Sequence, residues 1–289
     1  MDYFEPKSVN EALSLLAKYG DEARVIAGGT DVLVDMKYKE EPGCLVNIKK
    51  IPNLGAIQEN GGSLRIGPLV TIREIETSRL IRERLPLLWE SCHEFASLQI
   101  RNTATIGGNI CRASPSGETL APLLVLEARG KLAFSDGEKT EEFNSLFLGP
   151  GKTRLGSTGL LTEIEIPYPP QGSRGAYLKH AVRGAMDIAM VGVAVLIVSD
   201  AAKTSLQDVR IGLGAVAPTP IRATKTEALL RGKPPTAALV KESAALAASE
   251  SSPISDQRSS AEYRRWIVEA LTRRGLEQCW KAATGKEVA

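Results

Sequence analysis

Two stretches of this sequence combine paired glycines with small polar side chains, a pattern that suits an anionic ligand. The first stretch is Val25-Ile-Ala-Gly-Gly-Thr-Asp-Val-Leu-Val34. Its apolar beginning is typical of a short buried strand, and Thr30 and Asp31 are residue types that start helices. Gly28 and Gly29 let the backbone turn sharply between the two elements, where several N–H groups stay unpaired. The stretch therefore predicts a loop that binds a phosphate or a diphosphate.

The second stretch is Arg101-Asn-Thr-Ala-Thr-Ile-Gly-Gly-Asn-Ile-Cys-Arg-Ala-Ser-Pro-Ser-Gly-Glu118. Its glycine pair, Gly107 and Gly108, lies between Thr105 and Asn109, whose hydroxyl and amide groups can donate to phosphate and ribose oxygens. Two such loops suit a ligand with a long diphosphate spine. The alternative for each stretch alone is a strand-turn-helix whose glycines only form a tight turn.

Two familiar nucleotide-binding motifs do not match. No Gly-x-Gly-x-x-Gly opens a helix, which argues against the dinucleotide fingerprint and against a nicotinamide-dependent dehydrogenase. The run Gly149-Pro-Gly-Lys-Thr153 looks like a P-loop, but Leu146 stands where that motif needs its first glycine.

The composition is that of an ordinary globular protein. Of the 289 residues, 43% are hydrophobic and 24% charged, and the net charge of +2 gives no reason to expect nucleic acid or a membrane surface as partner. Four widely spaced cysteines and two histidines fit neither a disulfide framework nor a metal site. The first residues lack the features of a signal peptide, and the apolar run 189–198 is too short to span a membrane. We therefore expect a cytoplasmic protein.

The elements around the two loops predict an α+β fold in three parts. Residues 1–52 read as a small β-α-β-α-β unit, residues 53–170 as a larger α+β unit with antiparallel strands, and residues 171–289 as a C-terminal domain with a small antiparallel sheet and helices. The expected helices begin at Ser8 and at Thr71, include Val32, Leu33 and Met36, and occupy residues 85–96, 237–249 and 263–282. The expected strands are residues 45–48, 56–59, 63–66, 190–198 and 208–215.

The chain resembles the FAD-binding medium subunit of the molybdenum hydroxylases, the xanthine dehydrogenase and carbon monoxide dehydrogenase family. Residues 27–31 and 105–109 resemble the family's two flavin-diphosphate loops, and residues 4–12 resemble its opening strand and helix. Residues 212–220 and 255–265 resemble its C-terminal domain. The resemblance covers essentially the whole chain, so it implies a two-part FAD-binding domain followed by the C-terminal domain of the carbon monoxide dehydrogenase flavoprotein type.

The resemblance implies FAD as the cofactor and a set of contacts to it, with no catalytic residue and no metal ligand on this chain. Besides Phe95 and Arg112, the implied cofactor-binding residues are Arg24, Val25, Ile26, Ala27, Gly28, Gly29, Thr30, Asp31, Val32, Ala96, Ile100, Ala104, Thr105, Gly107, Gly108, Asn109, Cys111, Gly117, Glu118, Leu161 and Lys179. The glycines are assigned to the diphosphate, and Thr30, Thr105 and Asn109 are expected to donate hydrogen bonds. For Asp31, a backbone contact or a helix cap is expected, because its carboxylate would repel a diphosphate.

Three of these residues carry more specific expectations. Glu118 stands where the family usually has an aspartate that hydrogen-bonds a ribose hydroxyl, and its extra methylene changes the geometry. Leu161 corresponds to an apolar side chain that packs on the isoalloxazine ring. Lys179 corresponds to a lysine near the pyrimidine end of that ring, where a cation stabilises the anionic reduced flavin; the alternative is a solvated lysine on a strand. The spacing does not decide whether Tyr177, Arg183 or Asp187 assists it.

The function implied by the resemblance is that of an electron-transfer subunit. Electrons would pass from the [2Fe-2S] clusters of a small subunit through FAD to an external acceptor, while a large molybdopterin-binding subunit oxidises the substrate. The complex would be a heterotrimer that dimerises. The alternatives are a self-sufficient FAD oxidoreductase on the same scaffold and an assembly factor for the molybdenum enzyme. The sequence identifies neither the substrate nor the acceptor, which could be NAD, a quinone, ferredoxin or oxygen.

Overall fold

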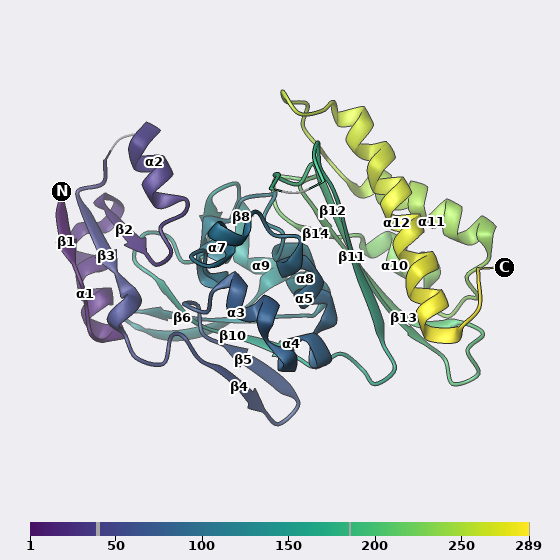
Figure 1. Cartoon of the computed structure of the whole chain (residues 1–289), viewed down its shortest axis with the longest axis horizontal. Coiled ribbons are helices and arrows are strands. Elements are labelled where there is room, and N and C mark those ends of the chain that lie inside the picture. Colours follow the sequence, from purple (N-terminus) through teal and green to yellow (C-terminus); the bar gives the residue numbers. More distant parts are fainter. Residues whose placement is uncertain (39–40, 185, 289) are drawn as a thin grey trace. The chain divides into compact units, whose positions relative to one another are not determined.

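The computed structural model describes residues 1–38, 41–184 and 186–288. The chain forms two compact units, whose helices and strands are labelled in Figure 1. The first unit comprises Met1–Ser78, Ser97–Ser114 and Glu127–Pro167, and the second comprises Arg79–Ala96, Pro115–Leu126 and the chain from Tyr168 onward. The second unit therefore includes two segments from the middle of the sequence. The division predicted at residues 52 and 170 stays a prediction.

The N-terminal part of the first unit is a three-stranded parallel sheet with helices, as the sequence predicts. Strands β1 (Asp2–Phe4), β3 (Cys44–Asn47) and β2 (Ala23–Ile26) lie in the order β1-β3-β2 (Figure 1). Helix α1 (Val9–Tyr19) packs its buried side chains against this sheet, and α2 (Val32–Tyr38) follows the first glycine loop. The short 3-10 helices η1 (Gly20–Glu22) and η2 (Ile48–Lys50) complete this part.

The start of α1, expected at Ser8, forms only half of a capping box. The Ser8 hydroxyl accepts a hydrogen bond from the Glu11 amide at 3.1 Å, as expected. The Glu11 carboxylate, however, accepts from the Lys7 amide at 2.8 Å and not from that of Ser8. The helix ends at Gly20, whose φ of +53° lies in the region that glycine adopts without strain.

The rest of the first unit is built on a five-stranded antiparallel sheet in the order β4-β5-β10-β6-β7. The strands expected at residues 56–59 and 63–66 are present and pair as a hairpin, with its turn at residues 60–62. The strands are β4 (Ile57–Asn60), β5 (Ser63–Ile66), β10 (Leu160–Pro167), β6 (Arg129–Phe134) and β7 (Gly137–Glu142), and the helices are α3 (Ile72–Thr77), α6 (Leu98–Arg101), α7 (Ile106–Arg112) and α9 (Phe143–Leu146). Residues 149–153, which look like a P-loop, lie in a small hairpin of β8 (Phe147–Gly149) and β9 (Lys152–Thr153).

The second unit contains a four-stranded antiparallel sheet in the order β11-β12-β13-β14. Its strands are β11 (Arg174–His180), β12 (Val191–Ser199), β13 (Leu206–Gly214) and β14 (Ile221–Arg222), and its helices are α4 (Arg79–Arg84), α5 (Pro86–His93), α8 (Leu120–Val125), α10 (Thr224–Leu230), α11 (Ala237–Glu250) and α12 (Ala261–Thr284). The expected strands 190–198 and 208–215 and the two expected C-terminal helices are therefore present.

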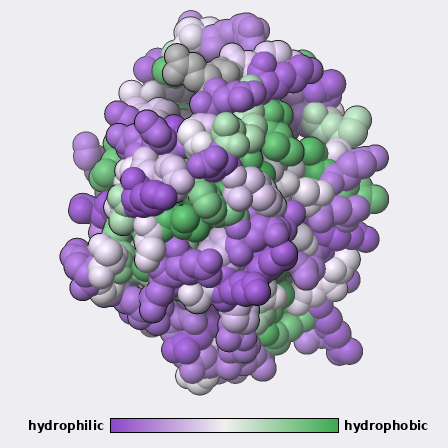
Figure 2. Space-filling model, turned by 90° about the vertical axis from the view of Figure 1, so that its left-hand side faces the viewer, coloured by the Kyte–Doolittle hydropathy of each residue, from purple (hydrophilic) through white to green (hydrophobic). Residues whose placement is uncertain are grey.

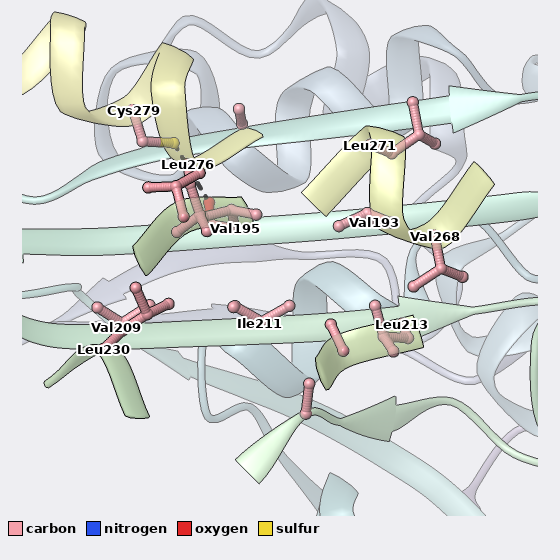
Figure 3. Packing of buried hydrophobic residues seen from close by; sticks show 14 of the residues in the cluster. Val193, Val195, Val209, Ile211, Leu213, Leu230, Val268, Leu271, Leu276 and Cys279 are labelled. Atoms are coloured by element: carbon pink, nitrogen blue, oxygen red, sulfur yellow. Dashed lines mark hydrogen bonds between the residues drawn. The ribbon is translucent and has the colours of Figure 1, made fainter. Parts of the chain in front are cut away.

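Helices cover both faces of this sheet, and alternation along the strands explains how. Val193 and Val195 of β12 and Ile211 and Leu213 of β13 point to the core that α11 and α12 close (Figure 3). On the opposite face, Gly212 lies so close to α8 that a Cβ atom built on it would be 2.6 Å from the carbonyl oxygen of residue 121. The small residue lets the helix approach the strand.

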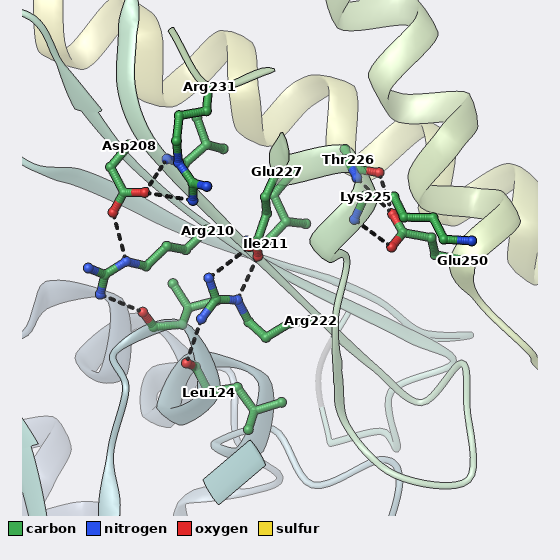
Figure 4. A network of polar contacts seen from close by, with 12 residues as sticks. Leu124, Asp208, Arg210, Ile211, Arg222, Lys225, Thr226, Glu227, Arg231 and Glu250 are labelled. Atoms are coloured by element: carbon green, nitrogen blue, oxygen red, sulfur yellow. Dashed lines mark hydrogen bonds and ion pairs between the residues drawn. The ribbon is translucent and has the colours of Figure 1, made fainter. Parts of the chain in front are cut away.

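Two arginines hold the C-terminal end of α8. Arg222 forms a buried ion pair with Glu227, at 2.6 Å from Nε to Oε1, and its Nη1 donates to the carbonyl oxygen of Leu124 at 3.3 Å (Figure 4). Arg210 donates to the carbonyl oxygen of Val125 at 3.4 Å. The last carbonyls of a helix have no partner within the helix, so these side chains satisfy them. The segment that begins just after Glu118 is thereby fixed to the C-terminal sheet.

The family-like run 255–265 also has a structural role in the second unit. Arg264 is only 3% exposed. Its Nη1 donates to the carbonyl oxygens of Met190 and Ala215, and its Nη2 bonds the carboxylate of Asp256 at 2.8 Å. One side chain thus connects the start of α12 to the ends of two strands and to the loop before the helix.

Candidate functional site

The first glycine loop connects β2 to α2 in the first unit, where it meets the second glycine stretch. A Cβ atom built on Gly28 would lie 2.1 Å from the carbonyl oxygen of Thr103, far inside any allowed contact. Gly29 has a φ of +76°, which side-chain-bearing residues rarely adopt. Gly28 is therefore required by the close approach of the two stretches, and Gly29 by the direction of the backbone.

The backbone N–H groups of residues 28–32 lie at the start of this loop and of α2. Over the described parts of the chain, no hydrogen bond engages the amide of Gly28, Gly29, Thr30, Asp31 or Val32. These residues are half-buried or exposed, so a ligand can reach them. A run of unpaired amides before a helix attracts an anion, because each N–H group carries a partial positive charge. The loop therefore fits the diphosphate of a dinucleotide cofactor.

The second glycine stretch is built differently, because the amides of residues 106–109 are already bonded. Thr105 caps α7: its hydroxyl accepts from the Gly108 amide at 3.1 Å, and its carbonyl oxygen accepts from the Asn109 amide at 3.0 Å. The Thr105 side chain is buried, whereas Gly108 is exposed and Asn109 half-buried. The expected hydrogen bonds from this stretch to the diphosphate stay a prediction, and they would come from atoms other than these capped amides.

Gly107 has a packing role that the sequence did not reveal. A Cβ atom built on it would lie 2.4 Å from Cβ of Pro68, and its amide donates to the Pro68 carbonyl oxygen at 3.0 Å. The neighbouring amide of Ile106 donates to the carbonyl oxygen of Val70 at 2.9 Å. These contacts anchor the beginning of α7 on the segment that leads into α3. The anchored α7 in turn supports the first loop.

Arg112, at the C-terminal end of α7, bonds to one carboxylate of the first glycine stretch and to one of helix α2. Its Nη1 and Nη2 contact the carboxylate of Asp35 at 2.5 and 3.3 Å. Its Nε lies 3.3 Å from Oδ1 of Asp31. The hydrogen bond that Arg112 donates to Asp35 raises the pKa of the Arg112 guanidinium above its usual value. The Asp31 carboxylate, for which a helix cap was one expectation, therefore forms an ion pair with the second stretch.

The apolar residues that are expected near the cofactor lie on both sides of the first glycine pair. Val25, Ile26, Ala27 and Val32 are all half-buried, so part of each side chain is accessible. Helix α2 buries none of its residues. On the face drawn in Figure 2, which is the left-hand side of Figure 1, hydrophobic side chains form separate patches among hydrophilic ones.

The remaining residues predicted to contact the cofactor differ in exposure and belong to both units. Arg24 is exposed, and its Nη1 donates to the carbonyl oxygens of Asp21 and Ala23 at 2.7 and 2.8 Å. Leu161 is only 1% exposed, inside the five-stranded sheet of the first unit, so its predicted contact with the flavin ring would require this side chain to become accessible. Of the others, Ile100 and Cys111 are exposed and Ala104 is buried in the first unit, while Phe95 and Gly117 are buried and Ala96 half-buried in the second unit.

Glu118 and Lys179, both in the second unit, form a buried ion pair. Nζ of Lys179 lies 2.9 Å from Oε1 of Glu118, and the side chains are 7% and 9% exposed respectively. The same Nζ donates to the carbonyl oxygens of Glu94 at 2.9 Å and Asp187 at 2.8 Å. Burial raises the pKa of Glu118, and the charge of Lys179 opposes this rise. The alternative of a solvated lysine is therefore wrong.

A hollow of about 310 Å³ adjoins Lys179 in the second unit. It is lined by Glu94, residues 179–184 and Asp187. Asp187 shapes this loop: its carboxylate accepts from the amide of Arg183 at 3.0 Å, while its carbonyl oxygen binds Lys179. Of the three residues that the spacing left open, Asp187 and not Arg183 contacts the lysine directly. Tyr177 is buried, and burial raises the pKa of its hydroxyl well above the usual value.

Asp35 and Glu94 are site residues that sequence reasoning missed. Asp35 follows Asp31 by one helical turn, which places both carboxylates on one side of α2, and this spacing is a signal for a shared cation. The contact of Glu94 uses its backbone carbonyl and therefore leaves no signal in the sequence. Among the described residues, no group of three or more His, Cys, Asp and Glu side chains could hold a metal ion. None of the described helices is both long and apolar enough to cross a bilayer.

Comparison with known proteins agrees with this geometry. The family model described as "FAD binding domain in molybdopterin dehydrogenase" matches residues 1–169, and that described as "CO dehydrogenase flavoprotein C-terminal domain" matches residues 176–279. The chain is 33% identical over 280 residues to the carbon monoxide dehydrogenase medium chain of Hydrogenophaga pseudoflava, covering 96% of each protein. It is 30% identical over 287 residues to the xanthine dehydrogenase FAD-binding subunit of Escherichia coli O157:H7, covering 98% of this chain and 97% of the relative.

A solved structure gives the same result for the fold. A chain of the carbon monoxide dehydrogenase from Hydrogenophaga pseudoflava, in a form that lacks the Mo-pyranopterin moiety, superimposes with a TM-score of 0.95 at 33% identity and 98% coverage of both chains. The fold, the amide-lined glycine loop and these matches define an FAD-binding flavoprotein subunit of an oxidoreductase complex. Specifically, the chain belongs to the FAD-binding medium subunits of the molybdenum hydroxylase family.

Proposed function

We propose that this chain transfers electrons, through FAD, from the [2Fe-2S] clusters of a small partner subunit to an external acceptor. FAD supplies the chemistry, since it accepts electrons singly and can release two together. The unpaired amides of residues 28–32 carry the proposal that this chain holds the cofactor, because they form a prepared site for its diphosphate.

In our proposal, different residues of the chain bind the diphosphate, exclude water and stabilise the reduced flavin. The first loop binds the diphosphate through its amides, and the close contacts of Gly28 with residue 103 and of Gly107 with Pro68 keep that loop in place. The half-buried apolar residues of the loop exclude water from the bound cofactor. The resemblance assigns Lys179 to the pyrimidine end of the flavin ring. There its charge, held in position by Glu118, would favour the anionic reduced form.

The partners in our proposal are a large molybdopterin-binding subunit and the small [2Fe-2S] subunit, in a heterotrimer that dimerises. The relatives support this arrangement, because they are named as medium chains or FAD-binding subunits and match over nearly their full length. We also propose that the complex works in the cytoplasm. The four cysteines are all free thiols, which is the state that a reducing compartment maintains.

The first test of this function is an absorbance spectrum of the purified chain before and after heat release of its cofactor. Flavin bands near one equivalent per chain, with the released flavin identified as FAD and not FMN, are expected. A colourless chain that also refuses added FAD would contradict the proposal and favour the assembly factor.

A second test separates electron transfer from self-sufficient catalysis. The FAD-loaded chain alone should oxidise no organic substrate, whereas the complex purified with its partner subunits should reduce the flavin when substrate is added. Substrate turnover by the isolated chain would show a self-sufficient oxidoreductase instead.

A further inference from the structure

Helix α5 lies against the outer edge of β11 in the second unit. β11 begins the sheet order β11-β12-β13-β14, so β12 is the one described strand that pairs with it. The helix comes close to the strand, since a Cβ atom built on Gly175 would lie 3.3 Å from Cβ of Leu87. Buried backbone amides on this edge need hydrogen-bond partners that a neighbouring strand would otherwise supply.

Glu90 of α5 supplies one such partner. Its carboxylate accepts a hydrogen bond from the backbone amide of Tyr177 at 2.8 Å, and Tyr177 is only 9% exposed. One helical turn further on, the carbonyl oxygen of Glu94 accepts a hydrogen bond from Nζ of Lys179 at 2.9 Å. The same helix thus contacts β11 at two positions, and the second of them is the lysine assigned to the flavin ring.

The spacing of these contacts fixes the register of the helix on the strand. Four residues of an α-helix advance about 6 Å, and two residues of an antiparallel strand advance about 6.8 Å. The contacts of residue 90 with residue 177 and of residue 94 with residue 179 therefore fit a single alignment of α5 on β11. Without the bond at residue 90, the helix would be free to shift along the strand, and the carbonyl oxygen of residue 94 would move away from Lys179.

We propose that Glu90 is a positioning residue for Lys179, because it fixes α5 on β11 and so keeps the carbonyl oxygen of Glu94 on the ammonium group. This inference rests on the proposed function of Lys179 beside the flavin ring. It adds a residue that acts on the flavin through the placement of that lysine.

The first measurement is the hydrogen exchange of the backbone amide of residue 177, followed by NMR on the full chain. Glu90→Met has a side chain of similar length without the acceptor oxygens, whereas Glu90→Gln keeps one. Exchange should be about fivefold faster in Glu90→Met, as for the loss of one ordinary hydrogen bond. Glu90→Gln should exchange at nearly the rate of the unmodified chain.

The second measurement is the reduction potential of FAD bound to the chain. Glu90→Met should lower this potential, because a lysine held less firmly stabilises the reduced flavin less. Glu90→Gln should restore it. Lys179→Met should lower the potential at least as far. Adding Glu90→Met to Lys179→Met should lower it no further, since Glu90 acts through the lysine.

A matched control is Glu250→Met in the same unit, because the Glu250 carboxylate accepts hydrogen bonds from the amides of Lys225 and Thr226 at 2.9 and 3.0 Å. This variant also removes an acceptor of backbone amides, but at α10, so it should lower the stability and leave the flavin potential unchanged. Equal shifts of the potential in Glu250→Met and Glu90→Met would overturn the inference, since general loosening of the unit would explain both.

Two further outcomes distinguish the inference from the function on which it rests. If Lys179→Met lowers the potential and Glu90→Met does not, the inference is wrong and the proposed function of the lysine stands. If the chain binds no FAD, or Lys179→Met leaves the potential unchanged, the proposed function fails and the inference fails with it, whatever the exchange rate of residue 177.

Discussion

The carboxylate of Glu118 binds the ammonium group of Lys179 at 2.9 Å, with both side chains less than one-tenth exposed. Two carbonyl oxygens accept the remaining protons of the ammonium group, so all three of its donors are used inside the second unit. The resemblance assigns one of these residues to the ribose and the other to the flavin ring, but here they form an ion pair with each other. The side chain of Glu118 is longer by one methylene than the aspartate that the resemblance implies at this position.

The first prediction concerns the stability of this pair. Lys179→Met should lower the free energy of unfolding by about 3 kcal/mol, because it leaves a buried carboxylate without its cation. Adding Glu118→Gln should return part of that loss, since no charge then remains buried. Urea denaturation followed by circular dichroism measures both changes.

The control for this prediction is the exposed pair of Lys131 and Glu138, whose side chains are 43% and 53% exposed. Lys131→Met should change the free energy of unfolding by less than about 1 kcal/mol. Equal losses in Lys131→Met and Lys179→Met would show that the Glu118–Lys179 pair has no special role.

A second prediction concerns the contact between the glycine stretches. Gly28→Ala should abolish or greatly weaken FAD binding, because its Cβ atom would lie 2.1 Å from the carbonyl oxygen of Thr103 and must push the two stretches apart. Gly55→Ala is the control in the same unit, since the Cβ atom it adds lies 4.0 Å from its nearest neighbour. Flavin fluorescence titration measures the affinity. Unchanged binding in Gly28→Ala would mean that the loop tolerates a wider spacing.

Short sequence patterns predicted those helices and strands whose formation depends on neighbouring residues. The strands expected at residues 56–59 and 63–66 and the helix start expected at Thr71 were confirmed, because each depends on residues a few positions apart. The long-range relationships were not predictable. Glu118 and Lys179 are 61 positions apart, and Gly107 packs on Pro68 through atoms whose proximity no periodicity encodes. The residue pattern identified both glycine stretches but not their different construction. Only the hydrogen bonds show that, over the described parts of the chain, the amides of residues 28–32 have no partner, whereas those of residues 106–109 are bonded.

The grouping of residues 79–96 and 115–126 with the second unit was likewise not visible in the sequence. These segments stand in the middle of the chain, and the apolar run 120–126 gave no periodicity that distinguishes a helix from a strand. Their place follows from tertiary contacts such as those of α8 with Gly212 and Arg222.

A third prediction tests how α8 packs on the C-terminal sheet. Gly212→Ala should destabilise the protein by about 2 kcal/mol, because the added Cβ atom would lie 2.6 Å from a backbone oxygen of residue 121 and the helix must move. Gly214→Ala on the same strand is the matched control. There the nearest atom is 3.6 Å away, an ordinary contact. Melting temperatures of the two variants measure the difference, and equal values would contradict the close packing described for Gly212.

The last prediction concerns acid stability and the turn between β12 and β13. The Asp200 carboxylate accepts hydrogen bonds from the amides of Thr204 and Ser205, at 2.6 and 3.0 Å, and from the Thr204 hydroxyl at 2.7 Å. These bonds lower the pKa of Asp200 from 3.8 to about 2, and the two bonds from backbone amides have the largest effect. A lowered pKa contributes stability above the ordinary value of 3.8, and this contribution disappears as the pH falls through about 2. Asp200→Asn should therefore melt below the unmodified chain at neutral pH, and the difference should narrow between these two pH values. A difference in melting temperature that is constant from neutral pH down to the lower value would show that the charge of Asp200 does not stabilise the turn.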